Sequence, residues 1–191
     1  MSATAASAQS RWSLGIDYSA LRTNLITPDD PTRAALNPLS SQGAGISLQW
    51  RIASRVALEV DAIYGAAGAS WTSELANVRV ESRIPMMQLP ILAQVRLLNR
   101  GQLSLDATAG VAITRAANGR LIDRTYDQEF ANFHTNQFGS AGVIGGQVSY
   151  NLKLPVRLAV RYVHGFSSVN PGEDTKLRGV NAILGLRILQ W

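Results

Sequence analysis

A histidine, two serines and a glutamate lie close together near the C-terminal end of the sequence. His164 is followed by Ser167, Ser168 and Glu173. An imidazole, a hydroxyl and a carboxylate are the three groups of a base–nucleophile–acid triad, which hydrolyses esters. The residues around His164 alternate between apolar and polar, so these groups would lie at the end of a strand, at the rim of a sheet.

This constellation resembles the site of the lipid A deacylases, which are eight-stranded barrels with such a triad near the outer rim. In that family the serine follows two residues after the histidine, whereas position 166 here is Phe. Strand parity also points His164 toward lipid, where an interfacial histidine needs no catalytic role. We therefore expect no catalytic residues. A lipid hydrolase that uses His164 and Ser167 is the alternative.

The sequence gives little support for metal or cofactor chemistry. The chain has no cysteine, which excludes thiolate ligands and disulfides. Asp29–Asp30 and Glu173–Asp174 could bind calcium, but adjacent acids in loops rich in proline and glycine are usually turn residues. No phosphate-binding glycine loop is present. We expect neither a metal nor a cofactor.

The composition bounds the class of protein. The chain has 191 residues, enough for one domain, and 46% of them are hydrophobic while only 16% are charged. Soluble domains carry about 25% charged residues, so a charged shell is missing. The net charge is +5, but the arginines are spread singly along the chain, which argues against nucleic-acid binding. We expect a flexible small-residue tail over residues 1–10, typical of the chain after a removed secretion signal, and one domain over residues 11–191.

Alternation of apolar and polar residues recurs along the whole chain. Between residues 11 and 20, Trp12, Ile16 and Tyr18 share one face of a strand, and Ser13 and Asp17 share the other. Most segments of this kind are about as long as a tilted strand that crosses a bilayer. Eight strands are predicted, over residues 11–20, 44–52, 56–64, 87–97, 103–114, 138–150, 156–166 and 180–188.

The connections between these strands alternate in length. Short turns are expected at residues 53–55, 98–101 and 151–155, and long loops at residues 21–43, 65–86, 115–137 and 167–179. An even strand number with short turns at one rim and long loops at the other is typical of bacterial outer-membrane barrels. The predicted fold is therefore all-β, an eight-stranded antiparallel up-and-down transmembrane β-barrel.

Aromatic residues fall into two groups if the N-terminus lies on the periplasmic side. Amphipathic rings prefer the two interfaces of a membrane, so two aromatic girdles are predicted. The periplasmic girdle contains Trp12, Trp50, Tyr150 and Trp191, and the outer girdle contains Tyr18, Tyr64, Phe138, Tyr162 and Phe166.

Two positions fit the strand pattern poorly. Pro90 lies in the middle of a predicted strand, so we expect a bulge or a local break there. Trp191 has the wrong parity relative to Leu186 and Ile188. A bulge near Gln190, or a strand that ends at Leu189, would resolve that parity.

The second face of the predicted strands carries four acids and five arginines, namely Asp17, Glu59, Asp61, Asp106, Arg51, Arg96, Arg157, Arg161 and Arg187. The interior of an eight-stranded barrel is just wide enough for side chains, and unpaired charges there would cost several kcal/mol each. We therefore expect a hydrogen-bonded ionic network that fills the lumen, in which Arg96 bridges acids on both neighbouring strands. A selective pore lined by arginine is the alternative.

Several stretches are similar to the PorT-like outer-membrane barrels of Bacteroidota. They are residues 83–96, which contain an isoleucine-proline strand, residues 105–110 and 160–165, and Leu177–Arg178 with the final strand. The resemblance implies a barrel fold and a bacterial outer-membrane location. Members take part in secretion machinery or have no known role, and the shared motifs contain no catalytic residues.

The sequence thus predicts a non-enzymatic integral outer-membrane barrel with a structural or partner-binding role in secretion or the cell envelope. Outer-membrane lipid surrounds it, and a protein partner is expected at the long extracellular loops. A soluble ligand-carrying barrel would need its apolar face inside, and the low charge content disfavours it.

Overall fold

Ten β-strands make up the regular structure of the described residues. The computed structural model describes residues 11–26, 36–73, 78–169, 172 and 174–191. Within these residues no helix is long and apolar enough to cross a membrane. The strands are β1 (Trp12–Ile26), β2 (Asn37–Arg51), β3 (Val56–Ser73), β4 (Val78–Arg100), β5 (Leu103–Ala116), β6 (Gly119–Asp123), β7 (Gln128–Phe133), β8 (Phe138–Tyr150), β9 (Val156–Ser168) and β10 (Lys176–Gln190).

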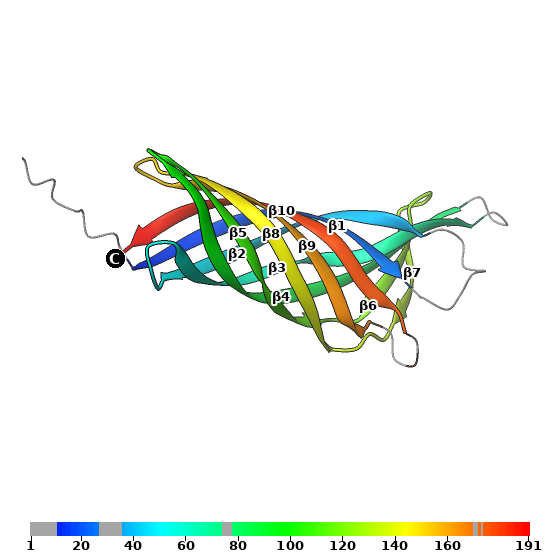
Figure 1. Ribbon diagram of the computed structural model, residues 1–191. Coiled ribbons are helices and arrows are strands. Elements are labelled where there is room, and N and C mark those ends of the chain that lie inside the picture. The colour runs from blue at the N-terminus through cyan, green and yellow to red at the C-terminus, as the bar shows by residue number, and fades with distance from the viewer. Residues whose placement is uncertain (1–10, 27–35, 74–77, 170–171, 173) are drawn as a thin grey trace, which may run out of the picture.

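Eight of these strands close into a ring, which confirms the predicted antiparallel barrel. The order is β3-β2-β1-β10-β9-β8-β5-β4, and pairing of β3 with β4 closes it. A row of paired residues followed once around the ring from Trp12 returns to β1 at Arg22, a displacement of ten residues (22 − 12). This displacement makes the strands tilt, as closure of a barrel requires. Figure 1 shows an elongated barrel with the C-terminus at one end and β6 and β7 at the other.

The end of the barrel that holds the C-terminus, here called the turn end, has the predicted short connections. β2 ends at Arg51 and β3 begins at Val56, and similarly short turns join β4 to β5 and β8 to β9. Trp12 and Trp191 exchange two backbone hydrogen bonds of 3.0 and 3.1 Å, and the Trp12 ring stacks on Trp50. The first and last strands therefore join here.

Both irregular positions are resolved in the ladder. The β1–β10 register shifts between Leu14 and Gly15, which pair with Leu189 and Arg187, so a bulge at residue 188 changes the parity before Trp191. Pro90 pairs with Ala112 on β5, but the β3–β4 ladder leaves it without a partner on β3. The expected local break is present at Pro90.

The predicted long loops are mostly strand, so their boundaries are wrong. β1 continues to Ile26, β2 begins at Asn37, β3 and β4 continue to Ser73 and from Val78, and β10 begins at Lys176. Residues 115–137 contain the β6–β7 hairpin, which pairs with β4 beyond the ring. We call this end of the barrel the loop end.

The boundaries are wrong because the apolar and polar faces of the strands change sides near the loop end. Up to Tyr18 the outward residues of β1 are apolar. Beyond Ala20 the outward residues include Arg22, and the inward ones include Leu21 and Leu25 beside Thr23. A strand that leaves the apolar belt no longer needs an apolar outer face. A prediction that requires an apolar outer face along the whole strand therefore ends each strand too early.

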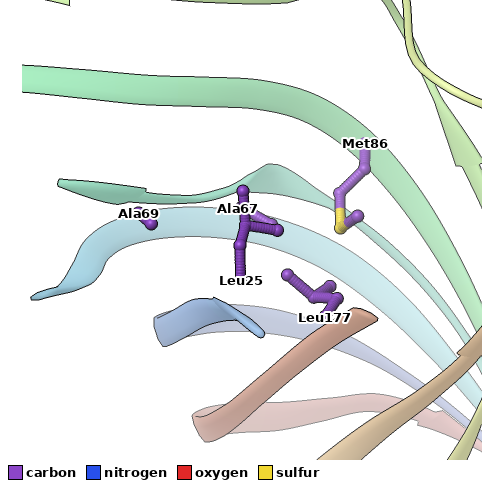
Figure 2. Packing of buried hydrophobic residues seen from close by; sticks show 5 residues of the cluster. All are labelled: Leu25, Ala67, Ala69, Met86 and Leu177. Atoms are coloured by element: carbon purple, nitrogen blue, oxygen red, sulfur yellow. The ribbon is translucent and has the colours of Figure 1, made fainter. Parts of the chain in front are cut away.

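The interior at the loop end is apolar as a result. Figure 2 shows Leu25, Ala67, Ala69, Met86 and Leu177, from four different strands, directed toward one another inside the barrel. Two further buried clusters consist of Leu92, Ala112, Ala141, Val143 and Val163, and of Ile63, Ala159 and Ile183. Nearer the turn end it is the outside of the barrel that is apolar, with exposed Ile16, Ile46, Ile91, Val111, Ile144, Leu158 and Leu184.

Candidate functional site

A cluster of five charged side chains lies inside the barrel, on the turn-end side of the apolar cluster that contains Leu25 and Met86. Arg157 contacts Asp17 with Nη2 at 2.8 Å from Oδ2, and Glu59 with Nη1 at 2.6 Å from Oε2. Arg161 donates to both Glu59 and Asp61. All five side chains are buried, and Glu59 has no exposed surface. We call these five residues the ionic cluster.

The ionic cluster spans the lumen from one wall to the other. Both arginines come from β9 and both Glu59 and Asp61 come from β3, which is four places from β9 in the ring of eight. These strands lie on opposite sides of the barrel. Charge-assisted hydrogen bonds therefore join opposite walls of the lumen at this level.

Gly185 of β10 makes space for one of these contacts. It pairs with Asp17 on one side and with Arg157 on the other, so it lies between the two partners. A Cβ atom at this position would lie 2.4 Å from Asp17 Oδ1 and 2.5 Å from Arg157 Nε. The missing side chain thus lets the guanidinium reach across β10 to the carboxylate.

Glutamines continue the polar interior toward the turn end. Gln94 of β4 donates to Glu59 and also bonds to Gln49 of β2. Gln147 of β8 donates to Asp106 at 3.2 Å. Each amide offers both donors and acceptors, so it can link a carboxylate to a further polar group.

Arg96 does not bridge acids on both sides, contrary to expectation. It contacts Asp106 on β5 at 3.0 Å, and its position in the β4–β5 ladder is directly opposite that residue. On the β3 side Gln94 lies next to Glu59 and fills the place expected for Arg96. The strand order alone does not fix how deep Arg96 lies relative to Glu59, because no short turn joins β3 to β4 at the turn end.

The two other predicted lumen arginines lie nearer the turn end. Arg51 lines a small cavity of about 10 Å³ together with Arg96 and Asp106. Arg187 is buried, and among the described residues no ion pair involves it. Seven of the nine charged residues assigned to the lumen are buried, and Arg51 and Arg96 beside the small cavity are half-buried.

The aromatic residues of the two predicted girdles lie on the outside of the barrel. Eight of them are exposed and Trp12 is half-buried against Trp50. At the loop end, the guanidinium of Arg115 lies 5.8 Å from the centre of the Phe138 ring. Their placement along the strands separates a group near the turn end from a group near the loop end.

The residues of the hydrolase alternative do not form a triad in the described part of the chain. The imidazole of His164 packs edge-on against Phe166, with ring centres 6.0 Å apart. The hydroxyl of Ser167 instead accepts from the backbone N–H of Ser140 at 3.0 Å and bonds to its hydroxyl. Glu173, like Asp29 and Asp30, lies outside the described residues.

The β6–β7 hairpin forms an ordered extension at the loop end that sequence reasoning missed. Arg124 contacts Glu81 of β4 at 2.8 Å and Asp127 at 2.8 Å. Asp123 accepts from the backbone N–H groups of Thr125 and Tyr126, which fixes the turn. The acidic and aromatic residues of 115–137 were visible in the sequence, but the five- and six-residue strands around this turn were too short to stand out as alternation.

Comparison with known proteins identifies the fold. No family model and no curated protein sequence matches the chain. Among solved structures, it is similar to the outer membrane protein OprG from Pseudomonas aeruginosa, with a TM-score of 0.61 and 14% identity over 94% of this chain and 97% of that one. Neisserial surface protein A gives a TM-score of 0.56 and 9% identity over 92% and 97% of the two chains. The chain has the fold of a small outer-membrane β-barrel.

The outer surface agrees with this fold. A closed barrel with an apolar belt around its outside is built for lipid, and barrels of this kind lie in the bacterial outer membrane. The protein is an outer-membrane barrel with a polar lumen at the turn end and an apolar interior at the loop end. The more specific resemblance to PorT-like barrels is not supported by these comparisons.

Proposed function

We propose that this protein is a closed, non-enzymatic outer-membrane barrel that binds a partner at its loop end. The turn end faces the periplasm and the loop end faces outward. The ionic cluster carries this proposal, because its salt bridges join opposite walls of the lumen and are almost completely buried. A barrel closed in this way holds its shape without conducting ions.

Planar-bilayer recording tests the closed lumen. We expect no steady conductance from the refolded protein, with a general porin reconstituted in parallel as the positive control. A large, steady and anion-selective conductance would show that the arginines line a pore, and the proposal of a closed barrel would be wrong.

The β6–β7 hairpin supports a partner-binding role. Its pairing with β4 and the salt bridge between Arg124 and Glu81 hold it in place, so it presents an ordered surface beyond the ring. Tyr126 at its turn is 70% exposed. An exposed aromatic side chain on a rigid support is a common anchor in protein interfaces.

Site-specific photo-crosslinking in intact cells tests this partner site. A crosslinking residue in place of Tyr126 is expected to give a discrete protein adduct, which mass spectrometry identifies. The same residue in place of Ser54, in the turn between β2 and β3, is the matched control. Adducts to lipid alone at position 126 would contradict a protein partner at the hairpin.

A further inference from the structure

Two arginines lie next to each other on the outside of the barrel, at the loop end. Arg22 of β1 pairs with Val180 of β10, and Asn24 pairs with Arg178, so the two arginines are diagonal neighbours across the ladder. Both are exposed. Among the described residues no ion pair involves either guanidinium. Like charges on neighbouring strands repel each other, so an anion between them would be favourable.

The tilt of the strands brings both arginines to the same level of the barrel. A row of paired residues is displaced by ten residues after eight strands. Each step to a neighbouring strand therefore changes the height along the barrel axis by a little over one residue. From Arg22, one step reaches the level of Arg178 on β10. A second step reaches the level of His164 on β9, which pairs directly with Arg178. Three basic side chains thus form a row around this part of the barrel.

This row lies where the apolar belt ends. Tyr18 on β1 and Tyr162 on β9 are exposed aromatic residues just below the row, and the exposed Phe166 follows His164 on β9. Beyond them, β1 turns polar on its outer face with Arg22 and Asn24. Tyrosines mark the level of lipid headgroups, so the row of basic side chains lies at the level of lipid phosphates.

A depression in the surface adjoins Arg22. Its volume is about 280 Å³, and its lining includes Tyr18, Ala20, Ser40 and Gln42. Ala20 is the outward residue directly below Arg22 on β1, and its small side chain forms the floor of the depression. The hydroxyl of Ser40 and the amide of Gln42 are hydrogen-bond donors at the upper edge.

We propose that Arg22 and Arg178 bind the phosphate of an outer-leaflet lipid, with an acyl chain of that lipid over Ala20. Guanidinium groups match phosphate oxygens with paired hydrogen bonds. Ser40 and Gln42 supply further donors, and the apolar floor below accepts hydrocarbon. The site goes beyond the closed barrel and the hairpin, and it uses the proposed function only for the orientation that puts the loop end in the outer leaflet.

The floor of the depression selects a lipid over a soluble polyanion. A sulfated or phosphorylated saccharide would use the arginines but would leave Ala20 without an apolar partner. A lipid uses both parts of the surface at once. In the membrane the lipid phosphate lies further out than the acyl chain, just as Arg22 lies further toward the loop end than Ala20.

Binding of fluorescently labelled lipid A to the full chain in detergent micelles tests the site. The double variant Arg22→Gln/Arg178→Gln is expected to bind about 10- to 30-fold more weakly than wild type, since each basic residue near a charged lipid surface contributes on the order of a tenfold or smaller factor. The control Arg55→Gln/Arg100→Gln removes the same charge from exposed positions at the turn end and is expected to bind like wild type. Both variants should keep heat-modifiable migration, because the four arginines are exposed.

Two further ligands distinguish the source of the anion. Lipid A without phosphates is expected to bind all three proteins equally weakly, and inorganic phosphate is expected to compete poorly because it lacks a chain. Equal binding of phosphorylated lipid A by wild type and the Arg22/Arg178 variant would overturn the proposal. So would a sulfated oligosaccharide or inorganic phosphate that displaces lipid A completely at equal concentration. A closed lumen in bilayer recordings alongside a failed lipid test would leave the proposed function intact.

Discussion

Arg157 of β9 and Glu59 of β3 meet across the full width of the barrel, with Nη1 2.6 Å from Oε2. Arg161, two inward positions further along β9, contacts the same glutamate and Asp61. Because β3 and β9 are on opposite sides of the ring, these contacts tie together walls that no backbone hydrogen bond joins. We therefore propose that the ionic cluster both closes the lumen and braces its walls against each other.

Replacement of Arg161 by alanine should strongly destabilise the barrel. Glu59 and Asp61 would keep their burial and lose one guanidinium, and breaking a buried pair in this way costs about 3–5 kcal/mol. The exposed Arg55→Ala should change the free energy of unfolding by less than about 0.5 kcal/mol. Urea unfolding of the refolded protein, followed by tryptophan fluorescence, measures both. Equal losses for the two variants would mean that the ionic cluster does not stabilise the fold.

Addition of one methyl group at Gly185 should disturb the contact between Arg157 and Asp17. The new Cβ would lie within 2.5 Å of both side chains, so we expect Gly185→Ala to destabilise by about 1–3 kcal/mol. Gly146 is the matched control, since a Cβ there meets only a backbone oxygen at 3.6 Å. Gly146→Ala should be neutral or slightly stabilising in the same unfolding experiment. A tolerated Gly185→Ala would show that the Arg157–Asp17 contact can form around an added side chain.

The strand pattern predicted the membrane-spanning part of the barrel because lipid imposes one rule on every strand. Outward residues such as Ile16 and Leu184 must be apolar, and inward residues such as Ser13 are free to be polar. The rule no longer holds beyond the lipid. Leu21 and Leu25 then face inward and Arg22 faces outward, so the same alternation continues with its meaning exchanged.

The pairing within the lumen was harder to predict than the faces. Strand parity indicates that Glu59, Arg96 and Arg157 point inward, but parity carries no information about depth on strands joined by long connections. The register places Arg96 opposite Asp106, and the barrel's curvature brings Arg157 to Glu59. Contacts between opposite walls depend on closure of the whole ring, which no local pattern contains.

A charge on the lipid-facing side of β5 should destabilise the barrel, whereas a conservative change on the lumen side should not. Ala107 faces outward near the middle of the belt and Thr108 faces inward, where it is buried. Ala107→Arg is expected to cost about 2–4 kcal/mol at the bilayer midplane. Thr108→Ser keeps the hydroxyl and should have little effect. Unfolding from vesicles rather than from detergent measures this, and equal effects at both positions would contradict the assignment of faces.

The orientation of the barrel can be tested directly because the chain has no cysteine. A single cysteine at Tyr126, in the exposed turn between β6 and β7, should react with a membrane-impermeant maleimide on intact cells. A single cysteine at Ser54, in the turn between β2 and β3 at the other end, should react only after the outer membrane is permeabilised. Each variant should react fully once unfolded, which controls for the reagent. Labelling of position 54 with position 126 protected would reverse the barrel, and Arg22 and Arg178 would then face the periplasmic leaflet, away from the lipid that we propose they bind.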